Sequence, residues 1–255
     1  MKKIIALLLA VAMLCCFAGC GAKNGDTDNN KLVMATNAEF PPYEYHEGDK
    51  IVGIDAEIAA AIAEKIGMEL EIADVDFDSI IPGVQEGKYD MGMAGMTVTD
   101  ERLEKVAFSD TYAKGVQVVI VKADGKIKSL DDVVGKKVGV QQGTTGDIYA
   151  SSSVEDGGYG EENVVKYANG ALAVEALKSG KVDCVIIDNE PAKAYVAANE
   201  GLAILDTEYA NEDYAICFAK ENTELQKKVN DALKELIADG SVQKIVDKYI
   251  NTDEK

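Results

Sequence analysis

The sequence is short of several residue types, and each shortage argues against a class of function. It contains no tryptophan, one histidine and one arginine, the last set against 25 lysines in 255 residues. A single histidine without clustered cysteines argues against a transition-metal site, and the absence of a DxDxDG loop argues against a calcium site. Positive charge is scarce, with a formal net charge of −19, which argues against nucleic acid as a partner.

The N-terminus has the layout of an export signal followed by a tether. A basic start, an apolar run too short to span a bilayer and small residues before Cys20 predict a signal peptide over residues 1–19. The ending FAGC resembles a bacterial lipobox, although Phe17 departs from the usual aliphatic residue, and an ordinary cleaved signal is the alternative. Residues 20–30 then predict a lipidated Cys20 and a flexible tether, which holds the protein outside the cytoplasm, on the outer face of the cytoplasmic membrane or in the periplasm.

Two cysteines, Cys184 and Cys217, remain in the body of the chain, each inside a strand-like apolar run. Cysteine in such a run is typical of a small buried hydrophobe. A disulfide between the two is the alternative in an exported protein, because sequence alone does not pair cysteines.

From Lys31 onward, strand-like and helix-like patterns alternate. Buried strands are predicted at LVMAT, LEIADV, YDMGMAG, KVGVQ and DCVIID. Helices are predicted at IDAEIAAAIAEKIG, FDSIIPGVQEG, ALAVEALKSG and EPAKAYVAAN, with two more near the C-terminus, ELQKKVNDALKELIADG and VQKIVDKYI. Alternation with nearly continuous apolar strands predicts an α/β fold whose parallel sheets are covered on both faces.

An internal echo divides this pattern into two similar units. Residues 84–90 (VQEGKYD) and 177–183 (LKSGKVD) each predict a helix end, a Gly-Lys turn and an aspartate that precedes a buried strand. We therefore expect two similar α/β lobes instead of one continuous sheet. Two such lobes could open and close around a ligand.

The lobes would be joined by two strand-like crossings, Tyr112–Val121 and Asp213–Ala219. Lobe 1 is then expected over residues 31–112 together with 213–255, and lobe 2 over residues 113–212. Because ligands of open α/β sheets lie beyond the carboxyl ends of the strands, we expect the binding site between the two lobes.

An ordered set of motifs resembles one known family. NAEFPPYEY, VGIDAEIAAAIAEKIG, DFDSIIPGVQEGKYDMGMAGMTVTDER, FSDTY, VGVQQGTTG and VDCVIID are similar to the extracytoplasmic amino-acid-binding proteins of ABC importers, solute-binding protein family 3. The resemblance runs from about Lys31 to Ile250. It implies the two-lobed periplasmic-binding-protein fold of type II and a free amino acid as ligand. It also implies delivery to the transmembrane permease subunits of a transporter, and we expect a monomer without a cofactor.

Arg102 and Asp188 are the candidates for the two charged groups that every free amino acid carries. A guanidinium meets a carboxylate with two parallel N–H···O bonds, which the point charge of lysine does not provide. The resemblance implies that Arg102 binds the α-carboxylate and that Asp188 binds the α-ammonium. The alternatives are a surface arginine on a short helix and, for Asp188, a helix N-cap.

Five small residues accompany these two. By resemblance, Ala94, Gly95 and Thr97 offer hydrogen bonds near the ligand, and Thr144 and Thr145 open a helix whose N–H groups suit a carboxylate. The glycine-rich look of QQGTTG does not indicate a nucleotide site, because the GxxxxGK[ST] pattern is absent.

The ligand's side chain is assigned to four further residues. By resemblance, Tyr43 and Phe77 sandwich it, with ordinary core packing as the alternative for each. Glu39 would attract a cationic side chain if it faced the pocket, and would otherwise pair with a lysine at the surface. Gln141 would favour a polar side chain.

Two other functional classes fit the sequence less well. Some proteins of this fold are dehydratases, but a dehydratase needs a positioned acid or base, and beyond Glu39 the matched pocket offers none. A sensor module would need a transmembrane helix and a signalling domain, and neither pattern occurs here. We therefore expect a binding protein that is not an enzyme.

Overall fold

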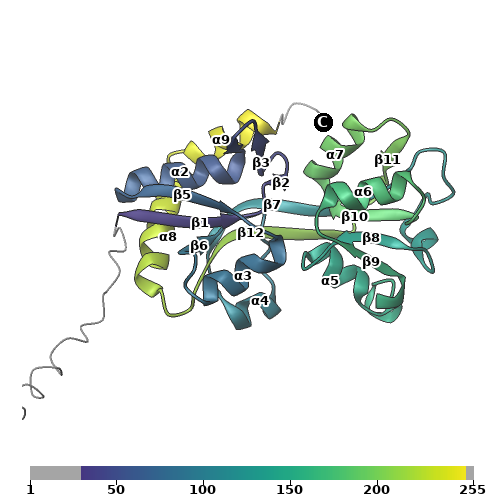
Figure 1. Cartoon of the computed structure of the whole chain (residues 1–255), viewed down its shortest axis with the longest axis horizontal. Coiled ribbons are helices and arrows are strands. Elements are labelled where there is room, and N and C mark those ends of the chain that lie inside the picture. Colours follow the sequence, from purple (N-terminus) through teal and green to yellow (C-terminus); the bar gives the residue numbers. More distant parts are fainter. Residues whose placement is uncertain (1–29, 251–255) are drawn as a thin grey trace, which may run out of the picture. The chain divides into compact units, whose positions relative to one another are not determined.

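The computed structural model describes residues 30–250 and has an α/β fold (Figure 1). The strands are β1 (Lys31–Thr36), β2 (Glu39–Phe40), β3 (Glu44–Glu47), β4 (Lys50–Val52), β5 (Glu69–Asp74), β6 (Met91–Gly92), β7 (Ala107–Lys122), β8 (Val138–Gln141), β9 (Val164–Tyr167), β10 (Cys184–Asp188), β11 (Leu202–Ile204) and β12 (Ala210–Phe218). The α-helices are α2 (Ile54–Ile66), α3 (Phe77–Gln85), α4 (Asp100–Lys105), α5 (Thr145–Ser151), α6 (Gly170–Lys178), α7 (Asn189–Ala198), α8 (Thr223–Ala238) and α9 (Ser241–Tyr249). The predicted signal peptide and Cys20 lie outside the described residues, as does the tether apart from Asn30.

Most strands belong to one mixed sheet with the order β5-β1-β6-β12-β7-β10-β8-β9, and β11 pairs with β7. Pairing is parallel among β5, β1 and β6 and again among β10, β8 and β9. Strands β7 and β12 pair antiparallel to each other and to the neighbouring strand on either side. The two predicted crossings are therefore present, but they hydrogen-bond the two parallel groups into one sheet instead of leaving them separate.

Helices cover both faces of this sheet at each end. We call β1, β5 and β6 with α2, α3, α4, α8 and α9 the β1 half, and β8, β9 and β10 with α5, α6 and α7 the β8 half. In Figure 1, α2 and α9 lie above the sheet and α3 and α4 below it, while α6 and α7 lie above β8 and α5 below. Helix α2 faces the core through Ile54, Ile58 and Ile62, which are fully buried and spaced four residues apart.

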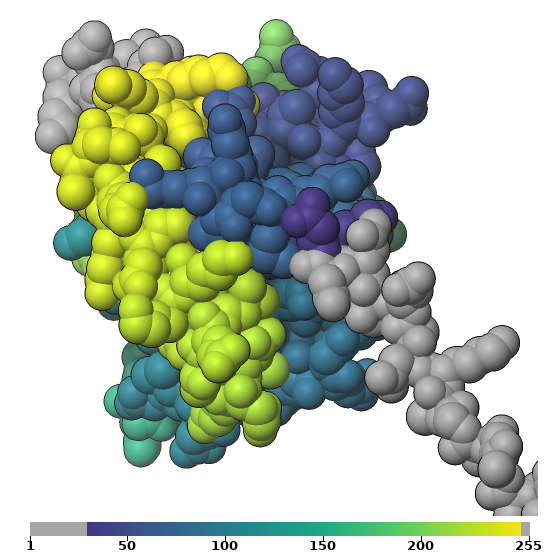
Figure 2. Space-filling model, turned by 90° about the vertical axis from the view of Figure 1, so that its left-hand side faces the viewer, coloured from purple at the N-terminus to yellow at the C-terminus, as the bar shows by residue number. Residues whose placement is uncertain are grey.

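The C-terminal helices return to the N-terminal part of the chain, as the sequence predicted. Figure 2 shows them, in yellow and yellow-green, beside the blue segment that contains α2 and β5. Polar contacts fix this packing: Glu57 on α2 accepts from Lys248 and from the Tyr249 hydroxyl, the latter at 2.5 Å. Lys65 forms an ion pair of 2.8 Å with Glu235 on α8.

The internal echo corresponds to the same local structure in both halves. After α3 and after α6 the chain turns through Gly87 and Gly180, with φ of 71° and 75°. The following aspartates then accept from the backbone, Asp90 from Val33 N in β1 at 2.7 Å and Asp183 from Lys137 N, directly before β8, at 2.9 Å. The repeated Asp is thus a side-chain clamp that fixes the helix end to the sheet.

One small sheet was not expected from the sequence, and the state of the two cysteines decides between the two interpretations given above. A small sheet of β2, β3 and β4, which the sequence did not reveal, follows β1. Cys184 and Cys217 are buried free thiols, and burial raises the pKa of each to about 12. The interpretation as small buried hydrophobes is therefore confirmed, and the disulfide alternative is not.

Candidate functional site

A cavity lies between the two halves, beyond the carboxyl ends of β1, β6, β8 and β10. Its lining comes from both halves. The β1 half and the loops at its strand ends contribute Asn37, Phe40, Glu44, Phe77, Ala94, Gly95, Thr97 and Arg102, and the β8 half contributes Gln141, Thr144, Thr145 and Asp188. All the expected pocket residues are in this set except Glu39 and Tyr43. The carboxyl-end rule for open α/β sheets therefore located the cavity correctly.

Arg102 enters the cavity from α4 and is 5% exposed. Helix α4 begins at the N-cap Thr99, whose hydroxyl accepts from Arg102 N at 3.2 Å. The guanidinium donates to Thr97 O at 2.7 Å and to Gly143 O at 3.1 Å, and it lies 5.4 Å from the Phe77 ring centroid. Burial lowers the pKa of Arg102. The guanidinium carries five N–H donors, so these two bonds leave it able to bind a carboxylate.

Asp188 ends β10 on the opposite side of the cavity. One carboxyl oxygen accepts from Gln117 Nε2 at 2.6 Å and the other from the Tyr214 hydroxyl. Asp188 occupies the N-cap position of α7, but its side chain makes no capping bond. Burial, and next the nearby Glu212 carboxylate, raise the pKa of Asp188 well above its usual value. The side chain is therefore directed to the cavity network and not to the helix.

Gly95 and Thr97 shape the wall between these two residues. Gly95 has a φ of 51°, and a Cβ there would lie 2.8 Å from the Phe40 ring, so the position suits glycine alone. Its N–H donates to Asp55 Oδ2 at 2.8 Å. Thr97 donates to Glu212 Oε2 at 2.9 Å, which ties the wall to β12.

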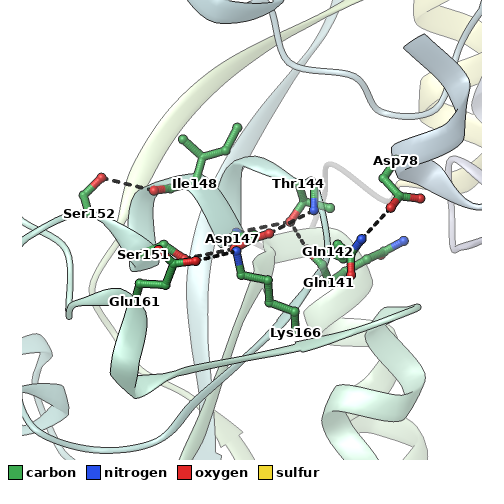
Figure 3. A network of polar contacts seen from close by, with 11 residues as sticks. Asp78, Gln141, Gln142, Thr144, Asp147, Ile148, Ser151, Ser152, Glu161 and Lys166 are labelled. Atoms are coloured by element: carbon green, nitrogen blue, oxygen red, sulfur yellow. Dashed lines mark hydrogen bonds and ion pairs between the residues drawn. The ribbon is translucent and has the colours of Figure 1, made fainter. Parts of the chain in front are cut away.

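The turn between β8 and α5 is held by side chains on both sides (Figure 3). Thr144 caps α5 by accepting from Asp147 N at 3.3 Å, and it donates to Gln141 O at 2.8 Å. Asp147 accepts from Gly143 N at 3.0 Å and forms an ion pair of 3.1 Å with Lys166. These bonds fix the carbonyl of Gly143 where Arg102 reaches it.

Two glutamines of the same turn reach across to the β1 half. Gln142 donates to Asp78 Oδ2 at 2.6 Å (Figure 3), and Gln141 donates to Asn37 Oδ1 at 2.9 Å. A third contact across the cavity joins the Tyr195 hydroxyl to Glu39 O at 3.0 Å. The two halves are thus joined by direct hydrogen bonds around the cavity.

Glu39 and Tyr43 lie elsewhere than expected. Glu39 is exposed and follows the alternation of β2, in which Phe40 is the buried residue. Tyr43 is buried behind the cavity wall, where its ring packs edge-to-face on Tyr214 with centroids 5.2 Å apart. The structure thus puts Phe40, and not Tyr43, on the cavity surface beside Phe77.

Glu44 is the acidic residue that lines the cavity in place of Glu39. It pairs with Phe40 across the β2–β3 ladder, so both side chains share the cavity face. Glu44 is 1% exposed; among the described residues no N–H or hydroxyl group donates to its carboxyl oxygens, and its hydrogen-bond partner is the Asp55 carboxyl. Burial and the neighbouring Asp55 carboxylate raise its pKa well above the usual value.

Asp55 stands behind Glu44 and is fully buried at the start of α2. Its Oδ2 accepts from Gly95 N and from the Tyr112 hydroxyl, both at 2.8 Å. Burial raises the pKa of Asp55 to about 6. Asp55 thus holds the Gly95 wall in place.

The described residues offer neither a metal site nor a membrane span. Across residues 30–250, no three His, Cys, Asp or Glu side chains are grouped in a way that would hold a metal ion. Within the same range, every helix is too short or too polar to cross a bilayer.

Comparisons with known proteins agree with this architecture. The arginine-binding extracellular protein ArtP of Bacillus subtilis (strain 168) is 36% identical over 254 residues, covering 98% of each chain. An ancestral arginine-binding protein, solved bound to arginine and also bound to glutamine, is 42% identical with a TM-score of 0.80, covering 87% of this chain and 98% of that one. The arginine-, lysine-, histidine-binding protein ArtJ of Geobacillus stearothermophilus is 34% identical with a TM-score of 0.81, covering 88% and 97%.

The family assignment covers nearly all of the described chain. Residues 32–252 match the family described as bacterial extracellular solute-binding proteins, family 3. The periplasmic-binding-protein fold expected from the sequence is confirmed by the matched structures. The chain therefore belongs to family 3 of the bacterial extracellular solute-binding proteins, which bind solutes and are not enzymes.

Proposed function

We propose that this protein is the amino-acid-binding component of an ABC transporter and that its ligand is a free L-amino acid with a cationic side chain. The observation that carries the choice of side chain is the Glu44 carboxyl, buried in the cavity wall with another carboxyl, Asp55, as its hydrogen-bond partner and no N–H or hydroxyl donor among the described residues. Ionising such a group without a cation is costly. A ligand cation beside Glu44 would remove that cost.

The backbone of the ligand would bind between Arg102 and Asp188. The guanidinium of Arg102 suits the α-carboxylate, and the carboxyl of Asp188 suits the α-ammonium. The two residues come from α4 and from the end of β10, so one zwitterion would contact both halves. Closure would then be stabilised by the ligand itself.

The charge of the cavity supports a ligand that carries net positive charge. Arg102 is the one cationic side chain in the lining described above, against the carboxyls of Glu44 and Asp188. Two further carboxyls, Asp55 and Glu212, are buried close behind them. An arginine or lysine ligand adds a side-chain cation beside these carboxyls, which favours their ionised forms.

The relatives support the same class of ligand. ArtP is described as arginine-binding, and ArtJ as binding arginine, lysine and histidine. A neutral polar side chain is the second candidate, because the amides of Gln141 and Asn37 meet in the cavity lining and the ancestral protein was solved with glutamine as well.

Several further features belong to this proposal. The β1 half and the β8 half would act as lobes over residues 31–112 with 213–255 and over residues 113–212, opening and closing around the ligand. The protein would work outside the cytoplasm as a monomer, anchored through a lipidated Cys20, and would deliver its ligand to the permease subunits.

Isothermal calorimetry of the purified protein against the twenty amino acids tests the proposal. We expect arginine or lysine to bind most tightly. Glu44→Gln should weaken the binding of arginine by at least about 2 kcal/mol, roughly 30-fold in Kd, because the ligand's side-chain cation loses its buried partner. Glutamine should be affected far less.

Glu39→Gln provides the matched control, since it is the same substitution five residues earlier on the exposed face of β2. It should leave the Kd of arginine and the Kd of glutamine unchanged. Binding of no amino acid would refute the function, and equal losses of arginine and glutamine in Glu44→Gln would refute the cationic ligand.

A further inference from the structure

A second carboxyl, Glu212 on β12, lies behind Asp188 and is 6% exposed. Its Oε2 accepts from Thr97 Oγ1 at 2.9 Å and from Gln117 Nε2 at 3.1 Å. The Tyr149 hydroxyl on α5 is a further hydrogen-bond partner of this carboxyl. Sequence reasoning assigned this residue no role.

Gln117 brings the two carboxyls together. The same amide nitrogen that donates to Glu212 also donates to Asp188 Oδ2 at 2.6 Å. Gln117 lies directly opposite Asp188 in the β7–β10 ladder and opposite Ala210 in the β7–β12 ladder. The sheet register therefore holds two acidic side chains against one shared amide, and the other donors to the pair, the hydroxyls of Thr97, Tyr149 and Tyr214, are also neutral.

The groups that face this pair supply little positive charge. Arg102 approaches from α4, Tyr149 from α5, Tyr214 from β12, Tyr43 from the segment after β2 and Glu44 from β3. Arg102 alone is cationic, and its hydrogen bonds go to the carbonyls of Thr97 and Gly143. Among the described residues, no carboxylate lies within ion-pair distance of its guanidinium.

Two buried carboxyls at close range cannot both ionise without a compensating cation. An α-ammonium at Asp188 is such a cation, and its arrival removes the reason for the pair to keep a proton. We propose that Asp188 keeps a proton beside the Glu212 carboxyl in the ligand-free protein and releases it to solvent when the ammonium of an amino acid binds, which makes Glu212 a positioning residue that links binding to pH. In this step one carboxyl O–H bond breaks, the proton passes to the buffer, and an ammonium N–H donates to the carboxylate that remains. The inference rests on the proposed function.

Proton release fixes the sign of the pH dependence. Because binding releases a proton, the affinity must rise with pH until the free pair is itself deprotonated. The limit for one proton is about a tenfold fall in Kd per pH unit. Burial and the nearby Glu212 raise the pKa of Asp188, which moves this dependence towards neutral pH.

Calorimetry in buffers of different ionisation enthalpy, at one pH, counts the protons directly. Glutamine is the better probe, because its neutral side chain does not engage Glu44 as a cation would, and arginine is measured beside it. We expect a net release of up to one proton with glutamine in the unmodified protein. Glu212→Gln should abolish most of this release while glutamine still binds.

Glu208→Gln is the matched control, since Glu208 is exposed and lies four residues before Glu212, and it should leave the release unchanged. Glu212→Asp should restore it. No release in the unmodified protein, or the same release in Glu212→Gln, would overturn the inference although the proposed function would stand.

The unmodified protein gives an independent check if Glu212→Gln does not fold. Its Kd for glutamine should fall as the pH is raised from about 5 to 8, and a flat profile would overturn the inference. Failure to bind any amino acid at any pH would refute the proposed function itself, and the inference with it.

Discussion

The two ends of the cavity both place a pair of buried carboxyls behind one wall, yet the pairs are built differently. At one end, Asp188 and Glu212 accept from Gln117, Thr97 and Tyr214. At the other end, Asp55 accepts from Gly95 and Tyr112, while Glu44 is hydrogen-bonded to Asp55 and receives no N–H or hydroxyl donor from the described residues. The difference separates what all amino acids share from what distinguishes one from another.

The Asp188 end is a network that is already hydrogen-bonded, so it can accept any ligand ammonium with little rearrangement. At the Glu44 end two carboxyls have only each other beside the ligand, so the free energy of this end depends on what the ligand's side chain brings. We expect changes at the first end to weaken every amino acid alike, and changes at the second end to alter the preference among them.

The largest effect should come from Arg102→Lys, because Arg102 is assigned to the α-carboxylate, which, like the ammonium at Asp188, every amino acid carries. Lysine keeps the charge but loses the planar fork and the bonds to Thr97 O and Gly143 O. Loss of charged hydrogen bonds should cost about 3 kcal/mol, roughly 100-fold in Kd. Calorimetry with arginine and glutamine should show similar losses for both. A change confined to arginine would break the comparison.

Asp55→Asn should sharpen the comparison through stability. The pKa of Asp55 is raised from 3.8 to about 6, so between these values the folded protein binds more protons than the unfolded chain. Its contribution is therefore most favourable at low pH and is lost as the pH rises through about 6. The size is of the order of 2 kcal/mol.

Urea unfolding at about pH 4.5 and pH 7.5 measures this dependence. In the unmodified protein, Asp55 favours stability at the lower pH against the opposite trend of ordinary surface acids. The Asp55→Asn variant should lack this contribution, so its stability should fall further on acidification than that of the unmodified protein. Identical dependence in the two proteins would show that Asp55 is not held with a raised pKa.

The smallest effect should come from Gln142→Ala, which removes the bond from the β8–α5 turn to Asp78 (Figure 3). This bond joins the halves without lining the cavity, so its loss should weaken all ligands equally. We expect a rise in Kd of roughly two- to tenfold, as for one ordinary hydrogen bond. Gln243→Ala, which removes a bond to Asp247 inside α9, is the control and should leave Kd unchanged. A shift in ligand preference would contradict the assignment.

Arg102 and Asp188, which we assign to the charged groups that all amino acids share, could be singled out from the sequence, and both line the cavity. Asp188 follows a continuous apolar strand, and Arg102 follows the apolar run around Met91 on a short helix with a threonine cap. Strand ends are where parallel sheets place ligand groups, and the single arginine stood out by composition. Local sequence patterns were sufficient to single out these two residues.

The discriminating end was not predictable in the same way. A two-residue strand, β2, is too short to show an alternating pattern, so the sequence does not reveal that Phe40 faces inward and Glu39 outward. Pairing with β3 then decides that Glu44 lies beside Phe40. The residue pattern of NAEFPPYEY does not predict the register of β2 against β3.

Long-range pairing explains the other differences. Strand β7 lies between β10 and β12 in a fixed register, and this register brings together Asp188, Gln117 and Glu212. Gln117 is separated in sequence from Asp188 by 71 positions and from Glu212 by 95, so no local pattern reveals the contact. The same pairing joins the two halves into one sheet. The sequence located both crossings, and the antiparallel hydrogen bonds between them came only with the structure.

Strand β12 departs from regular pairing with β7 between Tyr214 and Cys217, where its register shifts twice. Such irregularities let a strand bend without losing its ladder on either side. If the halves move as proposed, we expect the flexure to be concentrated there, where the backbone of Tyr214 lies and from which its side chain reaches Asp188. Opening would then displace the Tyr214 hydroxyl from Asp188, so that separation of the halves and weakening of the ammonium site would occur together.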